Sequence, residues 1–303
     1  MKSIMMASAL IVLSSATAAF AQFPLPLPTP TPAPTPTPTP TPPPVPPISV
    51  PVTLTVSGNE AFGSFDIGGI GADIKIKFEN VVGLVPAAFD VTATLVNPVD
   101  PALLARLPIG GLVGVPIGFP VVIRISPSAD SGLSFEGMYE VSLHTHNLHL
   151  DVNVPFSLFK SPDGGAFKDI TKSEGRGSYR DDGGGGDFSD FLIVVDLQPI
   201  DAVIAAKFAD LQSTISNNAG SMPPDVVATL QADLANARTL YQSGAIRDAI
   251  DAMRVFARYV KANSGENIPD VWRANCSPLV NVAGLLRSGA ETLRFSLDRK
   301  LSQ

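Results

Sequence analysis

The sequence predicts an all-β antiparallel sandwich followed by a small all-α helical bundle. Between residues 48 and 198, apolar residues alternate with polar ones in short runs that are separated by Gly, Pro, Asn and Asp. After Pro199 the apolar spacing changes to three or four residues, as on one face of a helix. A proline- and threonine-rich tract precedes both parts. The chain therefore divides into 1–21, 22–47, 48–198 and 199–303.

Seven alternating runs predict the strands of the sandwich. They are 52–56, 74–78, 89–96, 121–125, 139–143, 148–154 and 191–197. The run from Phe191 to Val195 is apolar at every position, so we expect it to be a central strand covered on both faces. One helical insertion is expected at 100–107, where Asp100 can cap the helix and Pro101 can occupy its first position.

Four amphipathic helices are expected in the second part. Apolar stripes indicate helices at about 200–215, 225–243 and 245–263, and a last helix at about 279–299. Pro269 and Pro278 interrupt the chain before the last helix. Short connections between amphipathic helices are typical of a small bundle.

The N-terminus has the pattern of a secretory signal peptide. A basic Lys2 precedes an apolar stretch, and Ala19-Phe20-Ala21 is a small-residue cleavage site before Gln22. The apolar stretch is shorter than the ~20 residues that span a bilayer, so we expect no transmembrane anchor. The protein should therefore be secreted or periplasmic.

The tract at 22–47 alternates proline with threonine. Proline fixes φ and removes a hydrogen-bond donor, so the tract should be a disordered or polyproline-II spacer of about 3 Å per residue. Two alternatives remain open: a stalk glycosylated on its threonines, and an uncleaved signal that acts as an anchor.

Charge and cysteine content exclude several partners. The net charge is −7, with 21 Lys and Arg and no basic run, which argues against nucleic-acid binding. The only cysteine, Cys276, cannot form an intrachain disulfide. A protein or another component of the cell envelope is the more suitable kind of partner.

The three histidines, His144, His146 and His149, lie within six residues. The alternation changes phase between Leu143 and Leu148, which predicts a bulge or tight turn around 145–147. His149 and Asp151 would then share the outer face with the first two histidines. A His-x-His pair can bind a metal ion such as Zn²⁺ with ligands from elsewhere. The alternative is that these side chains only solvate an exposed strand.

A second candidate metal site contains Asp181, Asp182 and Asp187 around four consecutive glycines. Carboxylates on a flexible turn suit Ca²⁺, although their spacing differs from the EF-hand pattern. A mobile hairpin turn explains the glycines more simply.

The last helices resemble a known module. The residues that carry the resemblance are 240–244, 249–253, 256–260, Gly265 and Ile268. They are similar to the FIMAH-type helical module of secreted bacterial proteins, over residues 225–301. Ala257 departs from the pattern, because a larger aliphatic residue is usual there. The resemblance implies packing or protein contact and no catalytic role. The central β region is loosely similar to an uncharacterised secreted bacterial family.

These patterns favour a secreted bacterial, non-catalytic binding or structural module of the cell envelope or exterior. Two alternatives remain. The first is a metal-dependent hydrolase that uses the His-x-His pair. The second is an adhesin presented on the proline- and threonine-rich stalk.

Overall fold

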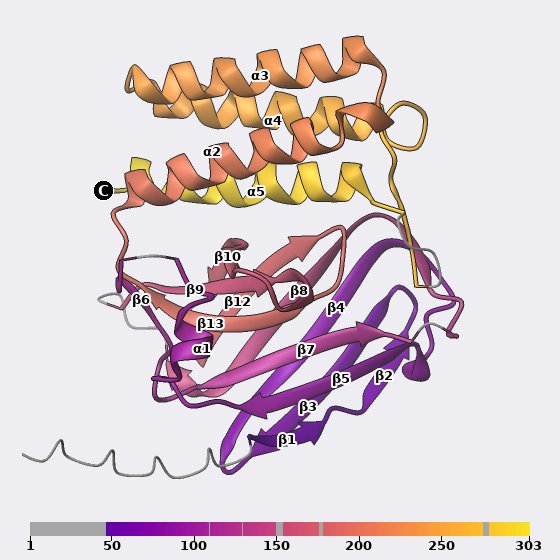
Figure 1. Ribbon diagram of the computed structural model, residues 1–303, viewed down its shortest axis with the longest axis vertical. Helices are drawn as coiled ribbons and strands as arrows, with labels where there is room; N and C mark the ends of the chain where they lie inside the picture. Colours follow the sequence, from indigo (N-terminus) through magenta and orange to yellow (C-terminus); the bar gives the residue numbers. More distant parts are fainter. Residues whose placement is uncertain (1–46, 109, 129, 150–153, 176–177, 275–278) are drawn as a thin grey trace, which may run out of the picture. The chain divides into compact units, whose positions relative to one another are not determined.

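The structure, a computed structural model, describes residues 47–108, 110–128, 130–149, 154–175, 178–274 and 279–303. They belong to one compact unit. Two antiparallel sheets followed by helices confirm the predicted fold class (Figure 1). The predicted signal peptide, the tract up to residue 46, Asp151 and Cys276 lie outside the described residues.

Each sheet has seven strands in the described chain. Sheet A has the order β1 (Ile48–Pro51), β5 (Phe89–Leu95), β7 (Val121–Pro127), β13 (Asp190–Asp196), β9 (Phe156–Ser161) and β10 (Lys168–Asp169), and β6 (Val113–Gly114) also pairs with β13. Sheet B has the order β11 (Thr171–Gly175), β12 (Ser178–Gly185), β8 (Ser134–His149), β4 (Ile70–Val82), β3 (Glu60–Ile67) and β2 (Leu54–Ser57), and β14 (Val271–Arg273) also pairs with β8.

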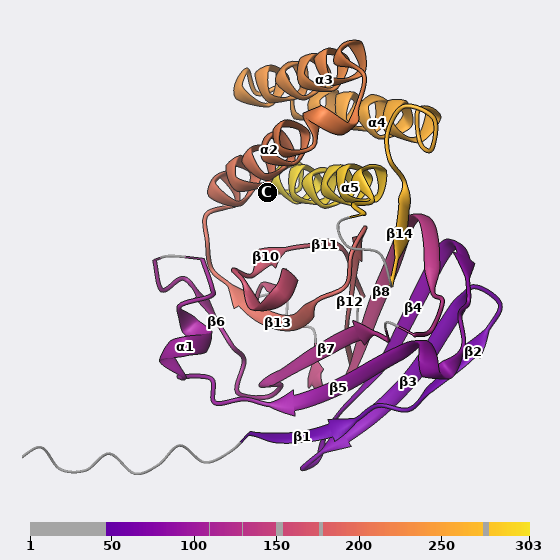
Figure 2. The ribbon, with the colours of Figure 1, turned by 45° about the vertical axis from the view of Figure 1, so that its right-hand side comes forward.

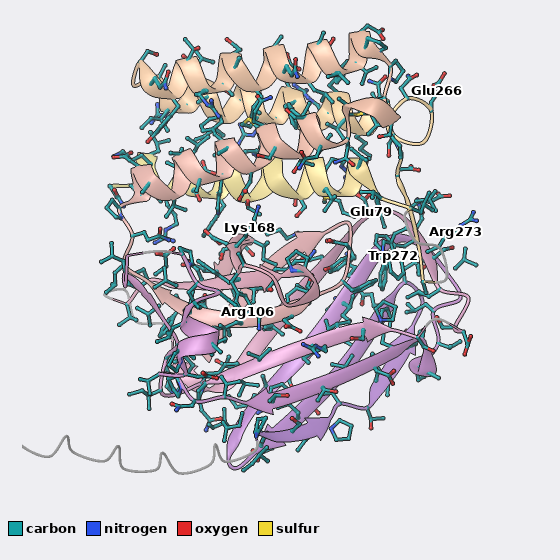
Figure 3. The ribbon with its side chains drawn as sticks, viewed as in Figure 1. Glu79, Arg106, Lys168, Glu266, Trp272 and Arg273 are labelled. Carbon is teal, nitrogen blue, oxygen red and sulfur yellow. The ribbon has the colours of Figure 1, made fainter. Side chains whose placement is uncertain are left out.

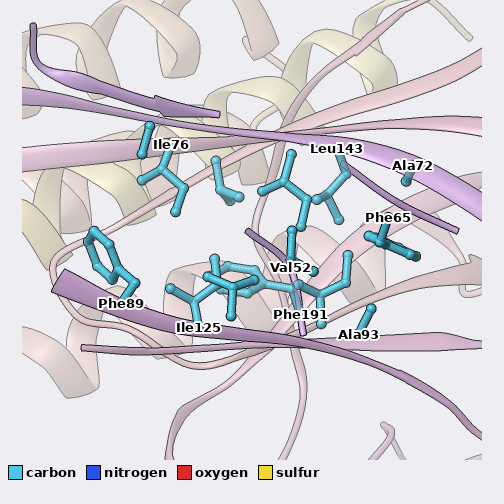
Figure 4. Close-up of a cluster of buried hydrophobic side chains, with 14 of the residues drawn as sticks. Val52, Phe65, Ala72, Ile76, Phe89, Ala93, Ile125, Leu143 and Phe191 are labelled. Carbon is cyan, nitrogen blue, oxygen red and sulfur yellow. The ribbon is translucent and has the colours of Figure 1, made fainter. Parts of the chain in front are cut away.

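The main core lies between the two sheets, where the inward residues of the alternating strands meet (Figure 4). Ile76 and Leu143 of sheet B pack in the same cluster as Ile125 and Phe191 of sheet A. The alternate positions of β13 face away from this cluster and are buried in a second one, which includes Leu103 of α1 (Pro101–Leu104). The predicted central position of β13 is therefore confirmed.

The predicted helical insertion is shorter than expected but begins as expected. The Asp100 side chain accepts a hydrogen bond from the Ala102 backbone N–H at 2.9 Å, and Pro101 opens α1. Short 3-10 turns lie at Pro86–Ala88 (η1) and Pro162–Gly164 (η2).

Four longer helices follow β13 in the chain. They are α2 (Ile200–Asn217), α3 (Pro224–Gln242), α4 (Ile246–Ala262) and α5 (Val282–Leu301), with a 3-10 turn, η3 (Ala219–Ser221), between the first two. Their apolar faces form one core, which includes Phe208, Leu230, Phe256 and Leu293. No helix in the described part of the chain combines the length and apolarity needed to cross a bilayer.

Helix α5 lies against sheet B, while α3 is the helix farthest from the sheets (Figure 2). The Arg287 guanidinium donates two hydrogen bonds of 2.6 Å to the Glu79 carboxylate on β4. Asn281, which caps α5, donates a hydrogen bond of 2.6 Å from Nδ2 to the Gly137 carbonyl on β8. Strand β14 also returns from the helical part to pair with β8. The predicted sandwich and bundle therefore share an extensive contact.

The glycine run is not the mobile hairpin turn that the sequence predicted. Gly183 to Gly186 are buried, and the run forms the end of β12 and its exit beneath α5. A Cβ atom at Gly186 would lie 2.7 Å from the Asn281 carbonyl oxygen and 2.9 Å from the Leu285 backbone nitrogen. Glycine is needed here because the helix backbone approaches the strand closely.

Candidate functional site on sheet B

The predicted bulge is present in β8. Burial alternates from Tyr139 to His146, and His146 and Asn147 are then both exposed before Leu148 is buried again. The pairing with β12 shifts at the same place, because Arg180 lies opposite His144 and Ser178 lies opposite His149. Strand β8 therefore has extra residues in this stretch, as its phase change predicted.

A buried hydroxyl closes the bulge. Thr145 is fully buried, and its Oγ1 lies within hydrogen-bonding distance of the carbonyl oxygens of Leu148, at 3.0 Å, and Tyr179, at 3.1 Å. This contact fixes the strand between the two histidines that flank Thr145 in the sequence. The site is thus built on a rigid element.

His144 and His146 both approach the same carboxylate oxygen. Asp73 Oδ2 lies 3.3 Å from His144 Nδ1 and 3.1 Å from His146 Nε2. The two imidazole rings are 6.0 Å apart and nearly perpendicular, at 79°. Asp73 lies opposite His144 in the β4–β8 pairing. The sequence analysis missed this carboxylate, since only the pairing of the two strands identifies it.

The predicted histidine site also included His149 and Asp151. His149 is exposed and lies beyond the bulge, opposite Ser178 of β12. Asp151 lies outside the described residues. No group of three or more His, Cys, Asp or Glu residues in the described segments is arranged so that it could hold a metal ion.

Beside the histidines, the outer face of sheet B has a depression of about 640 Å³. Residues of β2, β3, β4, β8 and β12 line it. Two rows of side chains cross it in register. They are Ser64, Asp73, His144 and Arg180 in one row, and Phe62, Lys75, Ser142 and Asp182 in the next. We call this surface the sheet B face.

Opposite charges alternate across the sheet B face. Asp182 accepts hydrogen bonds from the Ser142 and Ser173 hydroxyls. The Lys75 ammonium lies 2.9 Å from the Glu60 carboxylate and 5.4 Å from the centre of the Phe62 ring. Ion pairs that are partly open to solvent, as Lys75–Glu60 is, are weak and exchange partners at little cost. The surface therefore offers both donors and acceptors to an incoming molecule.

The predicted calcium ligands point in different directions. Asp181 is buried and accepts a hydrogen bond of 2.6 Å from the Tyr179 hydroxyl, while its neighbour Asp182 lines the sheet B face. Asp187 forms an ion pair with Lys160. Successive side chains on a strand project to opposite faces, so Asp181 and Asp182 cannot bind the same ion.

A family profile matches residues 40–300, which include both sheets and nearly all of the helical part. The chain belongs to DUF6689, a family of unknown function. No curated protein and no solved structure matches the chain.

In this member of DUF6689, one calcium candidate, Asp181, and the ion-pair partner of another, Lys160, are buried. Burial raises the pKa of Asp181 well above its usual value, and the Tyr179 hydrogen bond offsets only part of this effect. Burial acts to lower the pKa of Lys160, but the charges and hydrogen bonds of Asp187 and Tyr139 together outweigh it, so the pKa lies above its ordinary value. Lys160 is therefore a charged structural group and not a neutral nucleophile.

Proposed function

We propose that this protein is an exported, non-catalytic binding protein that uses the sheet B face to hold a protein or another component of the bacterial cell envelope. The observation that supports this most is the depression of about 640 Å³ lined from five neighbouring strands. Side chains on paired strands keep a fixed spacing. A fixed spacing suits recognition of a partner better than the less precise spacing of side chains on a loop.

The charge pattern indicates what kind of partner fits. Asp73, Glu140 and Asp182 lie among Lys75 and Arg180 on the depression. A partner that carries both charges can pair with each row, whereas a uniformly charged partner meets repulsion from half of the groups. Such complementarity contributes to specificity and to the rate of association.

Co-sedimentation with purified bacterial cell envelopes tests this proposal. The wild-type protein should pellet with the envelopes, and the double variant Lys75→Glu/Arg180→Glu should remain in the supernatant. The matched control is Arg247→Glu/Arg273→Glu, which reverses two charges at exposed positions of α4 and β14, away from the depression. Equal sedimentation of the two double variants, or no sedimentation of the wild type, contradicts the proposal.

Export depends on the signal peptide predicted at 1–21. If it is cleaved, the mass of the secreted protein corresponds to a chain that begins at Gln22. Additional mass in multiples of a hexose would favour the alternative of a stalked adhesin with glycosylated threonines. A mass that begins at Met1 contradicts cleavage.

The resemblance of residues 225–301 to the FIMAH-type module also supports the proposal. This resemblance, which covers nearly all of α3 and all of α4 and α5, implies a role in packing or protein contact. Arg287 and Asn281 of α5 hold sheet B through Glu79 and Gly137. We infer that the helices fix the sheet B face in place and add a contact surface of their own.

One observation favours the alternative of a metal-dependent hydrolase. Asp73 Oδ2 approaches both His144 and His146, so a carboxylate is available beside the predicted pair. This alternative requires Zn²⁺ to bind with a stoichiometry that falls in His146→Asn, as measured by calorimetry and plasma mass spectrometry on protein without an affinity tag. Equal Zn²⁺ content in the wild type and the variant contradicts it.

A further inference from the structure

A second cleft, of about 560 Å³, lies at one end of the sandwich. Its lining comes from β7 of sheet A, from β14 of sheet B, from Gly164 of η2 and from residues 187–190, which lead into β13. It shares no lining residue with the sheet B face. We call it the end cleft; Trp272, on its sheet B side, is labelled in Figure 3.

Aromatic side chains form one wall of the end cleft. Trp272 is partly buried and lies on Phe135, with ring centres 5.4 Å apart and planes at 24°. Phe188 meets the indole edge-on, with centres 5.1 Å apart and planes at 78°. These contacts hold the indole in one orientation. No hydrogen bond to the indole N–H is present in the described residues, so this donor is available to a ligand.

Three polar side chains among the lining residues of the end cleft have unused hydrogen-bonding capacity. The Arg124 side chain is 61% exposed and uses Nε and Nη2 to bind Asp190, which leaves Nη1 unused. Asp187 uses Oδ1 to bind Lys160, and its Oδ2 accepts no hydrogen bond from the described residues. The hydroxyl of Ser189, a residue only 6% exposed, is buried and has no partner among those residues.

The charged groups of the end cleft already have partners of opposite charge. Asp190 binds both Arg124 and Arg106, and Asp187 binds Lys160. A ligand that relied on charge alone would gain little here. A ring with an apolar face and several hydroxyl groups could instead stack on the indole and use the unpaired donors and acceptors.

We propose that the end cleft binds a saccharide. The sugar ring lies against Trp272, and its hydroxyls bond to Arg124, Asp187 and Ser189. This site goes beyond the proposed function of the sheet B face, because the two surfaces share no residue. Either one can therefore fail without the other. The sequence contains few aromatic residues and gives no indication of this site. Only the fold places the single tryptophan at a cleft.

Trp272 itself provides the assay, since it is the only tryptophan. Three probes are titrated into the full chain: the β-1,4-linked trimers of glucose and of N-acetylglucosamine, and trigalacturonate. At least one should shift the tryptophan emission to saturation and give a matching heat in calorimetry. A response to trigalacturonate alone would identify an acidic sugar, with the Arg124 guanidinium as its partner. The proposal is overturned if none of the three changes the emission or releases heat.

Two serine variants separate binding from folding. Ser189→Ala and Ser157→Ala each remove a buried hydroxyl that has no partner in the described residues, but Ser157 does not line the end cleft. Both should leave the thermal midpoint close to that of the wild type.

Ser189→Ala should weaken saccharide binding by about 3- to 10-fold, because it removes one hydrogen bond to the ligand. Ser157→Ala should leave saccharide binding unchanged. Arg124→Met should weaken binding to a similar degree while Asp190 keeps Arg106 as its partner. Wild-type affinity in both Ser189→Ala and Arg124→Met overturns the assignment.

Discussion

Asp181 is a carboxyl group that the sandwich core buries completely. One of its oxygens accepts a hydrogen bond of 2.6 Å from Tyr179, and Oδ1 has no partner in the described residues. Burial raises its pKa well above the usual value, so the folded protein retains a proton that the unfolded chain loses. The stability that this proton confers is present below the unfolded pKa of about 4 and is lost as the pH rises.

Asp181→Asn should therefore stabilise the protein at neutral pH. Asparagine keeps an oxygen for the Tyr179 hydroxyl and removes the cost of a buried acid, and we expect a gain of about 1–3 kcal/mol at pH 7. The gain should shrink as the pH falls towards 4, in urea unfolding at a series of pH values. Asp90→Asn makes the same change at an exposed strand position and should stay within about 0.5 kcal/mol of the wild type. A gain that does not depend on pH contradicts this account.

At the residue scale, periodicity predicted part of the candidate site. Alternation along β8 placed His144 and His146 on the outer face, and its change of phase located the bulge. Asp73 could not be predicted, because its contact with both histidines depends on the register between β4 and β8. Local alternation contains no information about which strands pair.

Strand β12 shows why an element can be misread from composition. Four glycines favour a turn when the chain is considered locally. The close approach of α5 overrides this tendency, because any side chain at Gly186 would collide with the helix backbone. By contrast, the boundaries of α2 to α5 follow the apolar periodicity closely, since those helices bury one face in a common core.

Gly186→Ala tests this element. Its Cβ would lie within 3 Å of backbone atoms at Asn281 and Leu285, so α5 must shift, and we expect a loss of about 1–3 kcal/mol of unfolding free energy. Gly220→Ala is the control, because a Cβ there has nothing within 4 Å. That variant should be neutral or slightly stabilising in urea unfolding. Similar losses in the two variants would show that close packing is not the reason for glycine at 186.

The Glu79–Arg287 pair joins α5 to β4. Burial acts to raise the pKa of Glu79, but the hydrogen bonds and charge of Arg287 outweigh it and the pKa lies below its usual value. A carboxyl group with a lowered pKa stabilises the fold above its unfolded pKa, and this contribution is lost as the pH falls through the folded pKa.

Glu79→Gln should lose about 1–2 kcal/mol at pH 7, a figure that allows for partial exposure of the carboxylate. The deficit should shrink as the pH falls through the lowered pKa of Glu79, where the wild-type carboxyl group also becomes protonated. Glu60→Gln alters a pair with Lys75, whose side chain is 40% exposed whereas that of Arg287 is 10% exposed, and it should change stability by less than about 0.5 kcal/mol. If the deficit of Glu79→Gln is as large at pH 3 as at pH 7, the charge of Glu79 is not its cause.

For the whole molecule, the change in the spacing of apolar residues at Pro199 identified where the sheets end and the helices begin, and α2 begins at Ile200. It did not predict how the two parts combine. Strand β14 lies between α4 and α5 in the chain and pairs with β8, so sheet B includes residues from the helical part. Only three residues form this strand, which is too short for an alternating pattern to be recognised.

This arrangement predicts that sheets and helices unfold together. Helix α5 contacts β8, β11 and β12, and Lys207 of α2 forms an ion pair of 2.7 Å with Asp169 of β10. Loss of the helices would expose these contacts and remove β14 from sheet B.

Circular dichroism at 222 nm follows mainly the helices, while Trp272 fluorescence follows the end of the sandwich. The two signals should therefore give the same urea midpoint and the same slope, as a single cooperative transition requires. Separate midpoints, with the helical signal lost first, would mean that the bundle is an independent domain and that its contacts with sheet B add little to stability.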